Sequence, residues 1–481
     1  MRFAANGYIC ERSLKEIRRK TWTQREERAL AGGAMRDRGP GGTRFRLFPR
    51  PPYAQPGRLP DVVYIATPPG SIGPGPSDDR IYLIDPIGKR QPYGMITGPY
   101  GTPHFDLPPW RGAIRRPVMP DADGHFDHIP FGTPEFEQAH VFGTIRFTLA
   151  VWERYFGQPI QWHFVRDFDR LEVVMLPAFN NAHVGYGFME VGAHHGGDGV
   201  TVPYSLNFDV VAHELGHLII YGTIGVPTRA TEDGEYFGFQ EAAADTTAMI
   251  AALHFNSLVE HLLEETRGNL FSYNELDRFA ELSPTEQIRL ASNSVKMSEF
   301  VGGWTDEHYL SQPLSGALFD ILVDMFQENL VERGLIRRAF ADLSDRVRDR
   351  PEYAAAIQGE YDAAYVGESE GFRTALLDAR DYLGIALAET WKRLSPHFLT
   401  YDEVGNILLA VDRALSGGRY RAEITESFDW REIGMVKVGP RLAPPDEKSH
   451  THSARTLLPG VRRRLPKMSF RERMLIARGA R

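Results

Sequence analysis

The sequence predicts an α+β protein with two lobes, the first rich in strands and the second mainly helical. Segments with a strand-like pattern are concentrated before residue 206, whereas the pattern from residue 207 onward is almost wholly helical. This segregation favours two lobes that meet along a cleft. The chain has 481 residues, of which 42% are apolar and 11% aromatic, so it can bury a large core and wholesale disorder is excluded.

Cysteine content and hydropathy exclude several further classes of protein. The only cysteine is Cys10, so the chain has neither an internal disulfide framework nor a cysteine-based zinc finger. No stretch approaches about 18 consecutive apolar residues, which predicts the absence of a membrane-spanning helix. Residues 1–30 lack the apolar core of a signal peptide, and we therefore expect a cytoplasmic location by default.

The two ends of the chain are basic, although the net charge is −8. Residues 1–60 carry 14 Lys and Arg against 5 Asp and Glu, and residues 441–481 carry 11 against 3, so the body between them is strongly acidic. Basic ends can bind nucleic acid or an anionic membrane, but neither end has the interleaved aromatic residues that stack on bases. We therefore interpret the ends as solvated tails and do not expect nucleic-acid binding. The sequence does not determine whether the protein forms oligomers.

The N-terminal quarter of the chain divides into two parts. Residues 1–60, rich in Arg, Gly and Pro, are predicted to be largely disordered, with at most a short helix near 11–30. Residues 61–124 form a Pro- and Gly-rich extension in which 61–66 and 81–84 have the composition of strands. The sequence leaves open whether this extension is inhibitory or stabilising.

The remaining chain is predicted to form a β-rich lobe over 125–222, a mainly helical lobe over 223–438 and a basic tail over 439–481. The elements expected from apolar spacing are, in order, a helix at 135–156, strands at 160–165, 171–176 and 184–191, and helices at 207–221, 238–265, 314–333, 335–349, 370–394, 401–416 and 422–433.

The sharpest feature of the sequence is the pentapeptide His213-Glu214-Leu215-Gly216-His217. Residues i and i+4 of a helix lie on the same face, so the two imidazoles can bind one Zn²⁺. The carboxylate of Glu214 can then reach a metal-bound water and act as general base. A motif this short also occurs by chance, so a zinc site needs the support of a third ligand.

A third ligand is predicted 28 residues after His213, at Glu241. Two histidines and one glutamate leave the fourth zinc position open for water, as a catalytic site requires. Asp245, one turn further along the same helix, can accept the free N–H of a ligating histidine. The alternative is an ordinary pair of acids near a helix N-terminus, favoured by the helix dipole. The histidine pair upstream favours the metal site.

Residues 209–217, followed by Glu241 and Asp245, resemble the thermolysin-like zinc metallopeptidases of the Glu-zincin group. The resemblance covers about residues 125–438, with Gly216 standing where the family usually has Thr. It implies a two-lobed peptidase fold with one catalytic zinc ion in the cleft between the β-rich and helical lobes.

The resemblance also implies roles outside the metal motif. Asn181 and Ala182, followed by a Gly- and Asp-rich turn over 192–199, are similar to the family's edge strand, whose Asn-Ala pair binds the substrate backbone. His308 is similar to the family's oxyanion-stabilising histidine. Arg289 is similar to an arginine that contacts the substrate.

A transition-state hydroxyl and a calcium site are two further features of the family. Tyr221 and Tyr236 are both candidates for the hydroxyl, and we favour Tyr236 because it lies between the histidine motif and Glu241. Asp209 matches a residue that helps to bind calcium in some members, but Ala252 stands where a partner acid is expected. The need for calcium is therefore uncertain, and we expect that site to be lost.

These residues together predict a zinc-dependent endopeptidase that acts on peptides or proteins, with Glu214 as general base. One alternative is a latent or inactive relative that binds peptides or a partner through the cleft. Another is a nucleic-acid-binding module with a structural zinc, but such a zinc normally has four protein ligands. The spacing of His183, His194 and His195 suits a loop better than a second metal site.

Overall fold

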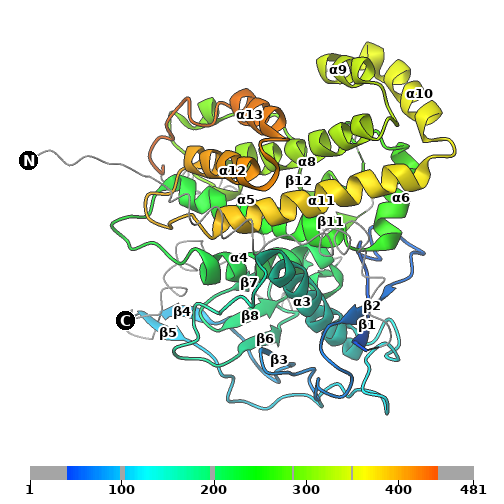
Figure 1. Ribbon diagram of the computed structural model, residues 1–481. Helices are drawn as coiled ribbons and strands as arrows, with labels where there is room; N and C mark the ends of the chain where they lie inside the picture. Colours follow the sequence, from blue (N-terminus) through cyan, green and yellow to red (C-terminus); the bar gives the residue numbers. More distant parts are fainter. Residues whose placement is uncertain are drawn as a thin grey trace, which may run out of the picture.

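The computed structural model describes residues 41–97, 103–195, 201–272, 274–283, 286–347 and 350–442. Sheets occupy mainly the N-terminal part of the chain and helices the C-terminal part, as Figure 1 shows, which confirms the predicted segregation of elements. Within the described residues, no helix combines the length and the apolar character that crossing a membrane requires.

The strands are β1 (Thr43–Leu47), β2 (Asp61–Ile65), β3 (Ile81–Ile84), β4 (Gly94–Thr97), β5 (Pro103–Asp106), β6 (Leu171–Met175), β7 (Ala182–Val184), β8 (Phe188–Val191), β9 (Ala193–His195), β10 (Thr201–Pro203), β11 (Arg278–Ser283) and β12 (Glu286–Leu290). The α-helices are α3 (Pro134–Phe156), α4 (Phe208–Thr223), α5 (Gly234–Ala252), α6 (Asn256–Thr266), α7 (Glu307–Leu310), α8 (Gln312–Glu332), α9 (Arg338–Val347), α10 (Ala354–Tyr365), α11 (Ser369–Trp391), α12 (Tyr401–Ser416) and α13 (Arg421–Trp430). Short 3₁₀ turns are η2 (Tyr204–Leu206), η3 (Met297–Phe300) and η4 (Pro351–Tyr353).

A four-stranded sheet has the strand order β3-β6-β8-β7. Strand β6 is parallel to both β3 and β8, whereas β7 pairs antiparallel with β8 through Ala182 and Val191 and forms one edge. Strands β6 and β8 are buried along their whole length, as expected for strands covered on both faces. The edge strand β7 contacts α4, so the predicted substrate strand lies beside the helix that carries the histidine motif.

Helix α4 is a central helix of the fold. Its N-cap is Asn207, whose side chain accepts a hydrogen bond from the Val210 amide at 3.2 Å, and residues 208–221 are all buried. A helix that is buried on every side needs neighbours all round. Helix α4 contacts α3, α5 and β7, and Figure 1 shows it between the strands of the four-stranded sheet and α11.

One continuous core joins the strands to the helices. The indole rings of Trp152 in α3 and Trp391 in α11 are fully buried and stack with their centroids 4.6 Å apart. Helix α8 in turn packs against α5, α11 and α13. The division into two lobes separated by a cleft remains a prediction.

Residues 41–60 correct the expectation of a largely disordered N-terminal segment. Strand β1 pairs with β2, and its Phe45 and Leu47 are fully buried against α3. The alternation of polar and apolar residues in β1 is a strand pattern, but the Arg-rich composition around it concealed that pattern. Residues 1–40, with the helix expected near 11–30, and the tail from 443 onward lie outside the described residues.

Three other expectations also differ from the structure. Residues 160–165 do not form a strand: 160–162 have no regular structure, and a turn follows from residue 163, in which the Val165 amide bonds to the Trp162 carbonyl at 3.2 Å. The expected strand at 184–191 is the β7–β8 hairpin, in which Gly187 adopts a φ of 90° that favours glycine. The expected helix at 238–265 is divided into α5 and α6, and α10 and the β11–β12 hairpin were not predicted.

Candidate metal centre

Helices α4 and α5 bring the three predicted metal ligands together. His213 and His217 lie one turn apart on α4, and Glu241 lies on α5. Nε2 of His213 is 3.3 Å from Oε2 of Glu241, and Nε2 of His217 is 3.6 Å from Oε1. One ligand atom from each residue lies within 4.8 Å of the others, and all three residues are buried. In the part of the chain that the structure describes, this is the one cluster of at least three such residues.

The geometry of this cluster fits a tetrahedral metal ion. Two ligands bound about 2.0–2.1 Å from a tetrahedral zinc lie about 3.4 Å apart, close to the separations of Glu241 from the two imidazoles. Nδ1 of His213 is 2.8 Å from Oδ1 of Asp245, and Nδ1 of His217 is 3.4 Å from Oε1 of Gln240. Acceptors at Nδ1 favour the tautomer in which Nε2 is free of a proton and can bind a metal.

The close approach of α4 to α5 depends on Gly216. A Cβ atom at this position would lie 2.7 Å from Cα of Ala244 and 3.1 Å from Cβ of Thr247. Since real side chains avoid such distances, the absence of a side chain lets the two helices pack closely enough to bring Glu241 beside the histidines.

Gln240 is a site residue that the sequence analysis missed, and its environment corrects the role given to Tyr236. The Tyr236 hydroxyl donates to the Gly225 carbonyl at 3.0 Å and accepts from Nε2 of Gln240 at 2.8 Å, and the side chain is fully buried. Tyr236 therefore lies behind His217, where it holds Gln240, rather than facing a substrate. Tyr221 stacks on the His217 ring with centroids 6.4 Å apart.

Glu214 lies between the two histidines in α4 and is 5% exposed. Burial raises the pKa of Tyr204 to about 12, and the negative charge of Glu214 adds to this effect. Tyr204 is thus electrostatically coupled to the predicted general base. Tyr204 lies in η2, before α4, and nothing in the sequence marked it.

His308 lies at the more open side of the cluster. Its Nδ1 is 2.8 Å from Oε2 of Glu241, and its side chain is 40% exposed. Asp306 caps the short helix α7 by accepting the His308 amide at 2.8 Å, which fixes the backbone there. Burial alone would raise the pKa of Glu241, but the nearby histidines outweigh it, and the pKa lies well below its ordinary value. The carboxyl group is therefore ionised, as a metal ligand must be.

The structure places the residues with predicted substrate roles on two hairpins. Asn181 directly precedes the edge strand β7, and Ala182 begins it. Arg289 lies in β12 opposite Phe279 of β11, but its side chain is outside the described residues, as are residues 196–200 of the Gly- and Asp-rich turn.

A small, mostly apolar cavity of about 20 Å³ lies beside Asp245. It has room for about one water molecule. Its wall is formed by Asp245, Thr246, Met249, Leu276, Leu290, Ala291 and Ser315.

Three of the other residues considered as metal ligands, His183, His195 and Asp209, have protein partners. Nε2 of His183 lies 2.6 Å from Glu190, and both side chains are fully buried. His195 lies 3.0 Å from the Pro177 carbonyl. Asp209, considered for calcium, forms a buried ion pair with Arg50.

Comparisons with known proteins give a distant likeness. No protein-family model and no curated protein sequence matches the chain. Among solved structures, one similar chain is the precursor of protealysin, a metalloproteinase from Serratia proteamaculans. The two chains are 12% identical with a TM-score of 0.39, over 69% of this chain and 84% of that chain. A likeness this distant does not bear on activity, so functional reasoning rests on the site itself.

Proposed function

We propose that this protein is a zinc-dependent endopeptidase. The observation that carries the proposal is the buried cluster of His213, His217 and Glu241, which has the composition and spacing of a catalytic zinc site with an open fourth position. Glu214, between the two histidines on the same buried helix, would supply the carboxylate base.

His213, His217 and Glu241 would hold a zinc ion, which would supply a Lewis acid for the peptide carbonyl and for the attacking water. Glu214 takes the proton of the attacking water at its carboxylate and passes it to the leaving nitrogen. Asp245 and Gln240 hold the two imidazoles in orientation and tautomer. His308, half exposed beside Glu241, donates a hydrogen bond to the substrate oxygen that becomes negative.

The proposed substrate is an extended peptide or protein segment. It pairs with the edge strand β7 near Asn181 and Ala182, because an edge strand offers unpaired backbone groups to an added strand. Arg289, on β12, is proposed as a further substrate-binding residue.

The test is to incubate the zinc-loaded protein with casein and to identify the new amino termini over time. The matched control is Glu214→Gln at equal zinc content. We expect the wild type to cleave casein, with the new amino termini giving its specificity, and Glu214→Gln to keep one zinc ion but to be slower by at least about a hundredfold.

Two results would contradict this proposal. Undiminished turnover by Glu214→Gln would remove Glu214 from the mechanism. If neither protein cleaves while both hold one zinc ion, the latent or inactive peptide-binding relative replaces the endopeptidase.

A further inference from the structure

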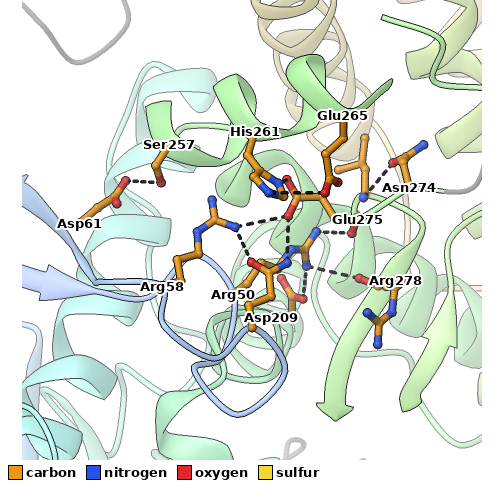
Figure 2. A network of polar contacts seen from close by, with 12 residues as sticks. Arg50, Arg58, Asp61, Asp209, Ser257, His261, Glu265, Asn274, Glu275 and Arg278 are labelled. Carbon is orange, nitrogen blue, oxygen red and sulfur yellow. Dashed lines mark hydrogen bonds and ion pairs between the residues drawn. The ribbon is translucent and has the colours of Figure 1, made fainter. Parts of the chain in front are cut away.

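Arg50 joins three segments that lie far apart in the sequence, as Figure 2 shows. It follows β1, and its side chain is only 2% exposed. Nη1 lies 2.6 Å from Oδ2 of Asp209 and 3.3 Å from the Arg278 carbonyl, and Nη2 lies 2.6 Å from the Glu275 carbonyl. One planar guanidinium therefore connects the turn after β1 with the first turn of α4 and with the segment that leads into β11.

The Asp209 side of this junction leads to the metal centre. Asp209 lies one helical turn before His213 on the same face of α4. Burial raises the pKa of Asp209, the charge of Arg50 opposes this, and the charge of Asp245 adds to it. Asp209 is thus electrostatically coupled to Asp245, whose Oδ1 lies 2.8 Å from Nδ1 of His213.

The other side of the junction leads to the wall of the cavity beside Asp245. Oδ2 of Asp209 also accepts the Ala280 amide at 3.3 Å, and Ala280 has a φ of +52°, which residues other than glycine rarely adopt. Such a conformation persists only where its surroundings enforce it. Leu276, between the two carbonyls that Arg50 binds, lines the cavity.

The N-terminal segment also holds the side chain of Glu275. Nε2 of Gln55 lies 3.1 Å and Nη1 of Arg58 lies 3.4 Å from Oε2 of Glu275, while Nδ1 of His261 lies 3.2 Å from Oε1 (Figure 2 shows Arg58, His261 and Glu275). Arg50, Gln55 and Arg58 of the N-terminal segment therefore all bind Glu275, and Arg50 also binds the Arg278 carbonyl.

We propose that Arg50 is a positioning residue for the metal centre. By binding Asp209 and the carbonyls of Glu275 and Arg278 with one guanidinium, it sets the position of α4 so that His213 stays aligned with Glu241. This inference rests on the metal-binding part of the proposed function. It makes the turn after β1 a fixed part of the metal site, although the sequence predicted that segment to be largely disordered.

The test compares Arg50→Met with Arg380→Met as a matched control. Arg380 is equally buried, at 2% exposed, and binds Asp381 and the Leu253 carbonyl. Unlike Arg50, it contacts no residue of α4 in the hydrogen bonds and ion pairs of the described residues. Zinc affinity is measured by competition with a chromophoric chelator, and ligand geometry by the visible absorption of the cobalt(II)-loaded protein. Thermal unfolding of the metal-free proteins reports stability separately.

We expect both variants to unfold at lower temperature, because each loses a buried charge partner. Arg50→Met should also bind zinc at least tenfold more weakly and change the cobalt absorption, whereas Arg380→Met should bind zinc within twofold of the wild type. Arg50→Lys should fall between wild type and Arg50→Met, because an ammonium group cannot reproduce the planar contacts.

A double variant guards against misfolding. Arg50→Met combined with Asp209→Asn leaves no lone buried charge, so it should regain stability over Arg50→Met and still bind zinc weakly. If a folded Arg50 variant binds zinc as the wild type does, or if Arg380→Met weakens zinc binding equally, the positioning role is overturned. If the wild type itself binds no zinc, the proposed function and this inference both fail. If the wild type binds zinc and a folded Arg50 variant binds it equally well, only this inference fails.

Discussion

Replacing Gly216 by Ala tests how closely α4 and α5 must approach for a metal to bind. The new Cβ would lie 2.7 Å from Cα of Ala244 and 3.1 Å from Cβ of Thr247. Favourable contacts between carbon atoms lie at about 3.5–4.0 Å. The nearest atom belongs to the backbone of α5 and cannot turn aside as a flexible side chain can, so the two helices must separate by about 1 Å.

Two effects on stability oppose each other in Gly216→Ala. Alanine is favoured over glycine in a helix interior by about 1 kcal/mol. Overpacking a dense core costs about 1–3 kcal/mol. We therefore expect a net loss of about 1 kcal/mol in the free energy of unfolding of the metal-free protein.

The expected effect of Gly216→Ala on metal binding is larger. Metal sites tolerate ligand displacements of only about 0.2 Å, whereas this substitution moves Glu241 by about 1 Å relative to His213 and His217. Zinc affinity should fall by about 10–100-fold, as it does when the groups that orient ligands are disturbed. The assay is competition with a chromophoric chelator, combined with calorimetry of the metal-free protein.

The matched control is Gly359→Ala. Gly359 lies in the helix α10, is exposed, and would place its Cβ in open space with no atom within 4 Å. It should gain about 0.5–1 kcal/mol and leave zinc affinity unchanged. If Gly216→Ala gained stability like this control and bound zinc as tightly as the wild type, the argument from helix separation would be refuted.

Three further predictions concern single side chains. Asp245→Asn should weaken zinc binding by about 10–100-fold in the chelator assay, because the amide holds the His213 tautomer less well, and unchanged affinity would contradict that role. Burial raises the pKa of Glu235 to about 7, so wild-type stability should fall by roughly 2–3 kcal/mol as pH rises from about 4.5 to 7, and Glu235→Gln should abolish this loss in urea unfolding. If the difference in free energy of unfolding between wild type and Glu235→Gln did not vary with pH, a raised pKa of Glu235 would be contradicted. Burial lowers the pKa of His140 to about 4, so the free energy of unfolding should decrease as pH falls from 6.5 toward 4. His140→Gln should reduce this decrease, and an unchanged pH dependence would contradict the role of His140.

The local chemistry of the metal helix was readable from the sequence because it depends on short-range order. The i and i+4 spacing of His213 and His217 within an apolar helical segment predicts one helix that presents two imidazoles on one face. The strand alternation of β1 was equally local, but its Arg-rich composition hid it. The roles of Glu214 as base and of His308 as oxyanion donor remain predictions from the sequence.

Only the tertiary structure decided which distant residues support those ligands. Tyr236 was a plausible substrate-facing hydroxyl by position, but packing buries it behind Gln240 and His217. Arg50 and Asp209 are 159 positions apart, and no local pattern links them. Spacing along one helix determines which side chains share a face, whereas the packing of separate elements determines which charges meet. For this reason the sequence by itself predicted the metal ligands, and only the tertiary structure revealed the contacts that hold them in place.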